Sequence, residues 1–180
     1  MARRRRCVGS SPTCRTINAK EGELRKYPST TPLPLAKLMI NRAQISEGMR
    51  VLDPCAGTGT LLKLAYASGA SVWAYELNEE RRTQLRQDLW TQFGAGGLAS
   101  DFFTNNREPV FDRVVFNPPF QADHGWDFAR EAQKCLKPGG RMVCLVGEKR
   151  YPNWPGAVAF EGVDLDFSNG LPAELMVYQS

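Results

Sequence analysis

The sequence predicts an α/β fold built on a doubly wound, mostly parallel sheet that ends in a C-terminal antiparallel hairpin. From residue 27 onward, short apolar runs alternate with segments of helical spacing, and the links between them are short. This alternation is typical of a mostly parallel sheet with helices on both faces. The last two apolar runs, over 162–167 and 174–178, have no helix between them. We therefore expect them to pair as a hairpin at one edge of the sheet.

Prolines, glycines and capping residues set the elements of the first half. Thr30 or Thr31 can cap a helix that has Pro32 near its first position, and Gly48 ends this unit. Asn78 can cap a later, long polar helix, which we expect to run to about residue 92. In order, the pattern predicts a strand over 49–52, a glycine-rich turn over 55–59, a helix over 60–67 and a strand over 71–75.

In the second half, two apolar runs of the buried type stand next to chain-breaking residues. The first, a strand over 113–116, leads into Asn117-Pro118-Pro119-Phe120. The second, a strand over 141–146, follows the stop signal Lys137-Pro138-Gly139-Gly140. The spacing between them predicts a helix over 125–136, and a short strand over 98–100 precedes both. The segment from 101 to 114 is too short for a full crossover helix.

Composition and charge bound the class of protein. The 180 residues are 42% hydrophobic and 23% charged, as expected for one globular domain. We find neither a transmembrane-length apolar run nor an apolar segment behind the basic start, so neither a spanning helix nor a secretory signal is expected. Residues 1–26 sum to +6 and residues 27–180 to −2. We interpret 1–26 as a flexible basic arm, in which Arg3, Arg4, Arg5 and Arg6 attract polyanions, and 27–180 as the folded domain.

The cysteines and the histidine exclude several kinds of site. Five cysteines at irregular spacing and a single histidine, His124, disfavour structural zinc and a disulfide framework. They also disfavour any Ser-His or Cys-His hydrolase that needs a second histidine. We therefore expect no metal and reduced thiols, which favours a cytoplasmic location.

Three segments that follow predicted strands suit a nucleotide-like cofactor. Gly57 and Gly59 let the backbone approach a ligand closely, and the amides that open the next helix favour an anion. Glu76 follows Gly57 by nineteen residues, a position suited to ribose hydroxyls. Asp101 offers an acceptor for an exocyclic amine, and Phe102 offers an aromatic face for a purine. The structural alternatives are a plain turn, a solvated Glu, a turn-capping Asp and a core Phe.

Asn117-Pro118-Pro119-Phe120 is the most specific motif in the sequence. Two prolines after an apolar strand fix the backbone and leave its carbonyls free to accept hydrogen bonds. The Asn117 side-chain oxygen and the Pro118 carbonyl could hold an NH2 group as paired acceptors, while Phe120 stacks on the ring that bears it. A rigid turn with a core Phe is the structural alternative. The motif indicates chemistry at an exocyclic amine, with Asn117, Pro118, Pro119 and Phe120 as catalytic residues.

On these motifs, residues 27–180 resemble the class I S-adenosylmethionine-dependent methyltransferases. Residues 51–59 look like the family's cofactor loop, 117–120 like the (D/N/S)PP(Y/F) motif of amino-group methyltransferases, and 27–32 like the segment before that loop in many adenine-N6 enzymes. The resemblance implies a Rossmann-like sheet of seven strands, the last antiparallel, and S-adenosylmethionine as cofactor, with Asp53 near its methionine part. The implied cofactor site comprises Thr30, Thr31, Asp53, Pro54, Ala56, Gly57, Gly59, Glu76, Leu77, Asp101, Phe102 and Asn117.

The order of the two motifs favours one substrate class. A cofactor loop that precedes the acceptor motif is similar to the gamma arrangement of DNA amino-methyltransferases, and parts of the chain look like small enzymes of phages and mobile elements. The resemblance therefore implies methyl transfer to adenine N6 in DNA, in the cytoplasm of a bacterium or a phage-infected cell. No segment is long enough for a target-recognition domain, so a separate specificity subunit could accompany this chain on nucleic acid.

Other substrates carry the same motif and stay open as alternatives. Enzymes that methylate guanine N2 in ribosomal RNA also have NPPF, and protein glutamine methyltransferases have NPPY. RNA adenine-N6 or guanine-N2 transfer and protein glutamine methylation are therefore alternatives to DNA. A non-enzymatic, cofactor-binding partner subunit is another. An NAD-dependent oxidoreductase is disfavoured, because the sequence lacks GxGxxG.

Overall fold

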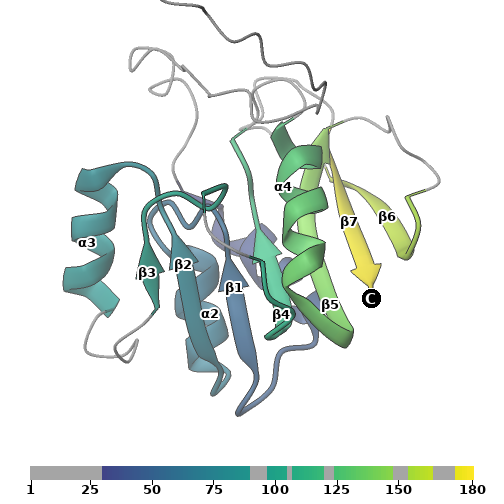
Figure 1. The fold of residues 1–180 in the computed structure, drawn as a ribbon, viewed down its shortest axis with the longest axis horizontal. Coiled ribbons are helices and arrows are strands. Elements are labelled where there is room, and N and C mark those ends of the chain that lie inside the picture. Colours follow the sequence, from purple (N-terminus) through teal and green to yellow (C-terminus); the bar gives the residue numbers. More distant parts are fainter. Residues whose placement is uncertain (1–29, 90–96, 105–106, 120–123, 148–153, 164–172) are drawn as a thin grey trace, which may run out of the picture.

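The computed structural model describes residues 30–89, 97–104, 107–119, 124–147, 154–163 and 173–180. These residues form one seven-stranded sheet in the order β3-β2-β1-β4-β5-β7-β6. The parallel strands are β1 Arg50–Asp53, β2 Ser71–Tyr75, β3 Leu98–Ala99, β4 Phe111–Phe116 and β5 Leu136–Gly147. β6 Ala157–Val163 and β7 Ala173–Gln179 are antiparallel at one edge (Figure 1). This is the predicted doubly wound α/β fold with its C-terminal hairpin.

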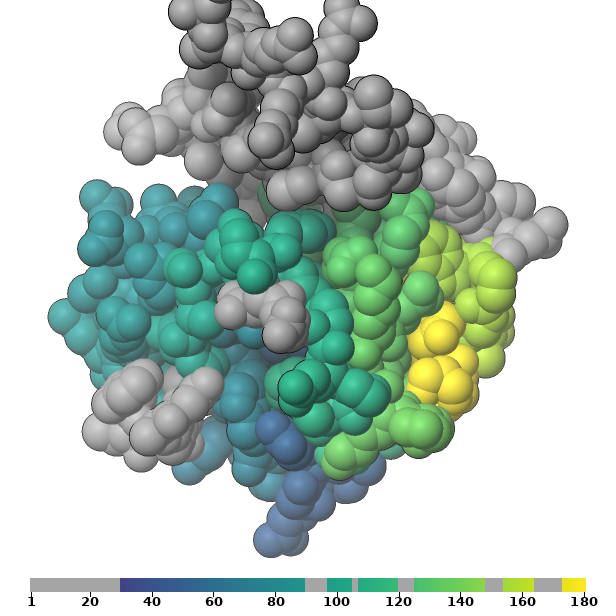
Figure 2. Space-filling model, in the orientation of Figure 1, coloured from purple at the N-terminus to yellow at the C-terminus, as the bar shows by residue number. Residues whose placement is uncertain are grey.

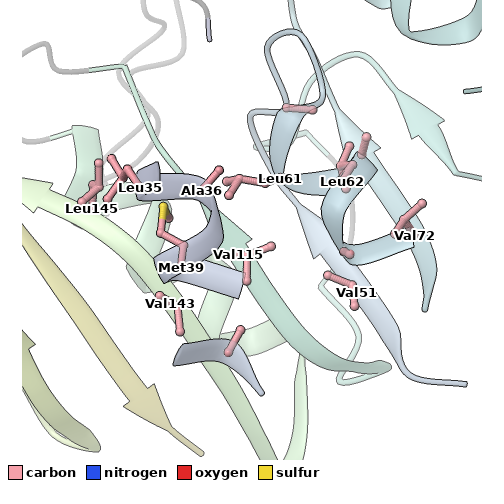
Figure 3. Packing of buried hydrophobic residues seen from close by; sticks show 14 of the residues in the cluster. Leu35, Ala36, Met39, Val51, Leu61, Leu62, Val72, Val115, Val143 and Leu145 are labelled. Carbon is pink, nitrogen blue, oxygen red and sulfur yellow. The ribbon is translucent and has the colours of Figure 1, made fainter. Parts of the chain in front are cut away.

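In the described part of the chain, three helices cover one face of the sheet. They are α1 Leu33–Ala43, α2 Thr60–Ala67 and α3 Glu79–Leu89. Their buried side chains pack against one side of the strands, as Met39 does near Val115 and Val143 (Figure 3). Val143 and Leu145, at alternate positions of β5, and Val115 of β4 point to this face, because successive side chains of a strand point to opposite sides.

Among the described residues, one helix and a cluster of aromatic side chains cover the other face. The helix is α4 His124–Ala132, which continues as a 3-10 turn over Gln133–Cys135 and lies in front of β4 and β5 in Figure 1. Its buried Trp126 and Phe128 pack with Phe116 and Phe102. Figure 2 shows this face, from the teal region of α3 at the left to the yellow strand β7 at the right. As the segment length predicts, no helix lies among the described residues between β3 and β4.

Most predicted boundaries are confirmed where glycines or prolines punctuate the chain. α2 and β2 have the predicted limits, and β1 differs by one residue. Asn78 caps α3, because its Oδ1 accepts a hydrogen bond of 2.9 Å from the Arg81 amide. The predicted arm over 1–26, Phe120, positions 164–167 of the predicted strand over 162–167 and the stretch from 90 to 96 lie outside the described residues.

The prediction that Thr30 or Thr31 caps the first helix is wrong. α1 begins at Leu33 with Pro32 as its N-cap, and no side chain caps its first turn. Pro34 stands in that turn and has no N–H group, so one fewer donor needs a partner. The two threonine hydroxyls are therefore available for contacts outside the helix.

Two further boundaries differ from the prediction. β6 begins at Ala157 rather than at 162. The sequence pattern does not reveal this start, because β6 is a half-exposed edge strand whose side chains alternate only weakly between buried and exposed. The helix before β5 ends early, and Lys137-Pro138-Gly139-Gly140 lies inside β5 rather than in a loop. There the pairing register with β4 shifts between Phe111 and Arg113, and Gly139 adopts a φ of 76°. The proline and glycines thus build an irregularity within a strand.

In the described part of the chain, no helix is long and apolar enough to cross a membrane.

Candidate functional site

The turn after β1 is held in a conformation that requires glycine. Gly57 and Gly59 have φ of 56° and 79°, in the left-handed region. A Cβ atom on Gly59 would lie 2.6 Å from Leu85 Cδ2, so α3 packs directly against the turn. The Ala56 amide donates a hydrogen bond of 2.9 Å to the Tyr75 carbonyl and ties the turn to the end of β2. The turn is thus a rigid platform at the carboxyl edge of the sheet.

Glu76, directly after β2, reaches across to this turn. Its Oε2 accepts a hydrogen bond of 2.8 Å from the Gly57 amide, and its Oε1 accepts one of 2.8 Å from the Asn78 amide. Glu76 is 7% exposed, and this burial raises the pKa of its carboxyl, although both backbone hydrogen bonds act in the opposite direction. Each carboxylate oxygen has a second lone pair, so Glu76 is suited to accept from two hydroxyls.

A second carboxyl group, Asp53, is buried beside Glu76 at the end of β1. Asp53 is 2% exposed, and its Oδ1 accepts a hydrogen bond of 3.0 Å from the Cys55 amide. Burial raises the pKa of Asp53 to about 8; the hydrogen bond from Cys55 opposes the rise and the charge of Glu76 adds to it. Two buried carboxyl groups therefore lie at the same sheet edge, and a nearby positive charge would stabilise the ionised form of each.

Asn117, directly after β4, presents a buried acceptor. Its Oδ1 is shielded from solvent and has no hydrogen-bond partner among the described residues. Pro118, which follows, is buried. Buried polar atoms are almost always hydrogen-bonded, so an unpaired oxygen at this position fits a group that is not part of the chain. The arrangement is the one expected for a site that accepts the hydrogens of an NH2 group.

Asn117 contacts the turn after β1 and the segment before α1, which in turn contact each other. The Cys55 thiol donates to the Asn117 carbonyl at 3.5 Å, and Asn117 Nδ2 donates to Thr31 Oγ1 at 3.3 Å. Thr30 Oγ1 lies 3.0 Å from Thr58 Oγ1. The segment before α1 thus contacts both the turn after β1 and the motif after β4. Sequence reasoning did not single out Cys55 or Thr58, since nothing local marks a contact between segments far apart in the chain.

The remaining predicted residues lie at the end of β2 and after β3. Asp101 Oδ1 accepts a hydrogen bond of 2.9 Å from the Phe103 amide. Phe102 is 3% exposed, stacks on Phe128 with 5.8 Å between ring centroids, and has the Arg107 guanidinium 4.0 Å from its own centroid. This placement favours the structural alternative for Phe102, a core side chain, and gives Asp101 a turn contact. Leu77 is 66% exposed next to Glu76, so an apolar surface is available there.

The residues present fit a positively charged nucleoside cofactor. The glycine turn, Glu76 and Asp53 lie together at the carboxyl edge of β1 and β2, which is the ligand-binding edge of open α/β sheets. Asn117 lies at the same edge, on the neighbouring strand β4. Of the predicted cofactor residues, the structure brings together Thr30, Thr31, Asp53, Ala56, Gly57, Gly59, Glu76 and Asn117. Among the described residues, no group of three metal-ligating side chains is found.

Comparison with curated proteins gives relatives with a stated activity. The tRNA (guanine(6)-N2)-methyltransferase of Thermus thermophilus is 35% identical over an alignment of 142 positions, which covers 66% of this chain and 39% of that protein. The tRNA (guanine(10)-N2)-dimethyltransferase of Methanothermobacter thermautotrophicus is 27% identical over an alignment of 134 positions, which covers 67% of this chain and 39% of that protein. The chain thus spans about two fifths of the length of these relatives.

Solved structures and a family model agree with the fold. The crystal structure of TrmN from Thermus thermophilus has a TM-score of 0.62 and 28% identity, and covers 85% of this chain and 50% of its own. An RNA methyltransferase from Salinibacter ruber, solved with S-adenosyl-L-homocysteine, has a TM-score of 0.60 and 18% identity over 83% of this chain and 92% of its own, which shows the fold alone. The family model described as methyltransferase small domain matches residues 34–154. The chain therefore belongs to the methyltransferase small domain family and has the fold of a class I S-adenosylmethionine-dependent methyltransferase.

Proposed function

We propose that this protein is an S-adenosylmethionine-dependent N-methyltransferase that acts on an exocyclic amine of a nucleobase in RNA, with guanine N2 as the favoured acceptor. The observation that carries the proposal is the buried Oδ1 of Asn117, which has no hydrogen-bond partner among the described residues and lies one strand away from Asp53 and the glycine turn. An acceptor atom without a partner is expected where an incoming NH2 group supplies the missing hydrogen bond.

The roles of the residues follow from their chemistry. S-adenosylmethionine supplies an activated methyl group: its C–S bond breaks, a C–N bond forms, and the amine's proton leaves to solvent. Glu76 would accept hydrogen bonds from the ribose hydroxyls, and the Asp53 carboxylate would face the positive charge of the methionine part. The exposed side chain of Leu77 offers an apolar surface for the adenine. This chain then has to orient the two reactants rather than supply a reactive group.

Asn117 and Pro118 would act on the acceptor. The lone pair of an exocyclic amine is delocalised into the ring, which makes the amine a poor nucleophile. Acceptance of its two hydrogens by Asn117 Oδ1 and the Pro118 carbonyl would hold the nitrogen with its lone pair toward the methyl group. Phe120, outside the described residues, is proposed to stack on the base. A paired base must first leave its stack, which costs a few kcal/mol and favours single-stranded or looped RNA.

The preference for RNA and for guanine rests on the relatives. The two relatives named above are tRNA guanine-N2 methyltransferases, and the sequence motif accommodates guanine N2 as well as adenine N6. The expectation of adenine N6 in DNA rests on motif order, on residues 27–32 and on a likeness to small phage enzymes, whereas the relatives named above are tRNA enzymes, so we propose the RNA alternative in its place. Arg3–Arg6 of the arm, also outside the described residues, would add attraction to phosphates.

Product identity tests this proposal. The full-length protein is incubated with methyl-labelled S-adenosylmethionine and, in parallel, unmodified tRNA transcripts, single- and double-stranded DNA, and a protein extract free of nucleic acid. Mass spectrometry of the digested products should find N2-methylguanosine in RNA. N6-methyladenine in DNA would contradict RNA as the substrate. Methylglutamine in protein would contradict a nucleobase as the methyl acceptor. The variant Asn117→Ala should give no product in any arm.

A further inference from the structure

We propose that the guanidinium groups of Arg113 in β4 and Arg141 in β5 form a binding site for a phosphate-type oxyanion. The site lies toward the amino-terminal ends of the parallel strands, whereas Asp53 and Asn117 lie at their carboxyl ends. Neither arginine belongs to the candidate cofactor and acceptor site, so this inference does not depend on the proposed methyl transfer. The phosphate is either part of an RNA backbone or a free ion, and the experiments below separate these sources.

The two arginines stand side by side on neighbouring strands. Arg113 is paired with Arg141 in the register of β4 and β5. Each arginine precedes by two positions a valine that faces α1–α3, namely Val115 and Val143, so both arginine side chains leave the sheet on that face. Like charges at directly opposite positions destabilise a sheet. The pair therefore lowers the stability of the sheet unless an anion neutralises it.

Hydrogen bonds within the protein use only part of each guanidinium. Arg141 Nε donates to Gln179 Oε1 at 3.0 Å, and its Nη1 donates to the Arg42 carbonyl at 3.2 Å. Arg113 Nη1 donates to the Asp112 carbonyl at 2.7 Å. Among the residues that the structure describes, the Nη2 group of neither arginine has a partner, and neither Nη2 is shut off from solvent. Both Nη2 groups are thus available to donate to a ligand.

The carboxylate next to Arg113 in sequence is engaged by other groups. Asp112 Oδ1 accepts a hydrogen bond of 2.7 Å from Lys137 Nζ, and its Oδ2 accepts one of 2.8 Å from the Arg50 amide. Burial and then the charge of Arg141 lower the pKa of Arg113, and the charge of Asp112 opposes this only in part. The surroundings of Arg113 thus disfavour its positive charge, which a bound anion would stabilise.

The carboxylate beside the end of α1 is engaged as well. Glu161 accepts from Nε and Nη2 of Arg42, at 2.7 and 3.0 Å. Within the described ranges, no carboxylate forms an ion pair with Arg113 or Arg141. The two guanidinium groups therefore leave a positive charge that an external anion can neutralise.

The donors suit an oxyanion with several acceptor oxygens. A guanidinium is a planar fork that matches phosphate and carboxylate oxygens, and arginine is the residue most often used for such recognition. Two forks side by side provide more donors than the two oxygens of one carboxylate need, which favours a phosphate. Arg141 is also held ready, because its acceptor Gln179 is fixed by a hydrogen bond of 2.7 Å from Nε2 to the Gly139 carbonyl.

A titration with inorganic phosphate tests the site directly. Nuclear magnetic resonance follows the Nε–Hε signals of Arg113 and Arg141 in the full-length protein, at constant ionic strength with chloride as the replaced ion. Their loss in Arg113→Gln and Arg141→Gln assigns them. Both signals should shift together, with a dissociation constant of about 1–10 mM. If neither signal shifts up to about 50 mM phosphate, the inference is wrong, whatever RNA does.

Urea unfolding supplies a second readout. A ligand that binds only the folded state stabilises it, so phosphate at constant ionic strength should raise the urea midpoint of wild type. The rise should be lost in Arg113→Gln and Arg141→Gln. Arg86→Gln is the matched control, since it removes the same charge from an exposed position of α3, on the β3 side of the sheet (Figure 1). An equal loss in Arg86→Gln would show a general charge effect and contradict the site.

Lysine variants cover the case in which a glutamine variant does not fold. Arg113→Lys and Arg141→Lys keep the positive charge but lose the planar fork. Each should weaken phosphate binding by at least about threefold, the size of one net hydrogen bond. Unchanged phosphate affinity in both lysine variants would overturn a site built on paired forks.

Binding of a tRNA transcript identifies the source of the phosphate. If the RNA backbone occupies the site, Arg113→Gln and Arg141→Gln should each weaken RNA binding by about 3- to 10-fold more than Arg86→Gln does. Each should also reduce the salt slope by about one, and inorganic phosphate should compete. Phosphate-dependent shifts together with RNA affinities equal to that of Arg86→Gln would assign the site to free phosphate.

Discussion

The Gly57 amide donates a hydrogen bond of 2.8 Å to Glu76 Oε2, so the turn after β1 and the end of β2 are joined directly. Glu76 is thereby held at the carboxyl edge of the sheet with lone pairs to spare for a ligand.

Glu76→Ala should weaken binding of S-adenosylmethionine by roughly 10- to 150-fold, or about 1.5–3 kcal/mol, because a carboxylate that accepts two hydroxyls is lost. Isothermal calorimetry measures the change. Glu76→Gln, which keeps an acceptor oxygen, should lose less. Cofactor affinity within twofold of wild type in Glu76→Ala would show that the carboxylate only supports the turn.

Gly59→Ala should destabilise the protein more than Gly48→Ala does. Both glycines have a left-handed φ, 79° and 77°, so both substitutions carry the same backbone cost of about 1–2 kcal/mol. A Cβ on Gly59 would meet Leu85 Cδ2 at 2.6 Å, whereas a Cβ on Gly48 would have nothing within 4 Å. We expect an extra loss of about 1–3 kcal/mol for Gly59→Ala from overpacking, measured by urea unfolding. Equal losses would mean that α3 yields to the new methyl group.

Asp53 should make cofactor binding depend on pH. Burial raises the pKa of Asp53 to about 8, and a positively charged ligand favours the ionised form. Binding then lowers this pKa and releases a proton below pH 8, so affinity rises by up to about tenfold per pH unit toward pH 8 and levels off above it. Calorimetry at pH 7 in buffers of different ionisation enthalpy counts the proton. Asp53→Asn should abolish the release, and no release from wild type would contradict the assignment.

Most of the fold is predictable because certain residues mark where helices and strands begin and end. Gly69 and Glu76 bracket β2, and Gly59 precedes α2, so these limits could be inferred from local chemistry. β6 was placed too late because an edge strand is half-exposed and Gly162 weakens its pattern. The strand position of Pro138 could not be foreseen, since only the pairing of β5 with β4 and β7 overrides its local preference.

The sequence predicts which residues form the site, but it does not predict the hydrogen bonds between them. Asp53, Glu76 and Asn117 each follow an apolar run, which marks them as strand-end residues that meet at one edge. The contact from Asn117 to Thr31 spans 86 positions and carries no local signal; the cofactor role of Thr31 is implied by the resemblance and stays a prediction. Phe102 was ambiguous for a physical reason: a buried aromatic ring and a stacking platform have the same sequence pattern until the neighbours, here Phe128 and Arg107, are known.

Turnover and cofactor affinity of Asn117→Ala, measured side by side, test the central claim most directly. The claim is that Asn117 Oδ1, buried and unpartnered among the described residues, accepts a hydrogen of the acceptor amine. Its loss should lower single-turnover methylation of RNA by at least about 100-fold, as the removal of one preorganised hydrogen-bonding group does in other active sites. The dissociation constant of S-adenosylmethionine should stay within about threefold of wild type. An equal loss of cofactor affinity, or methylation at the wild-type rate, would contradict the account.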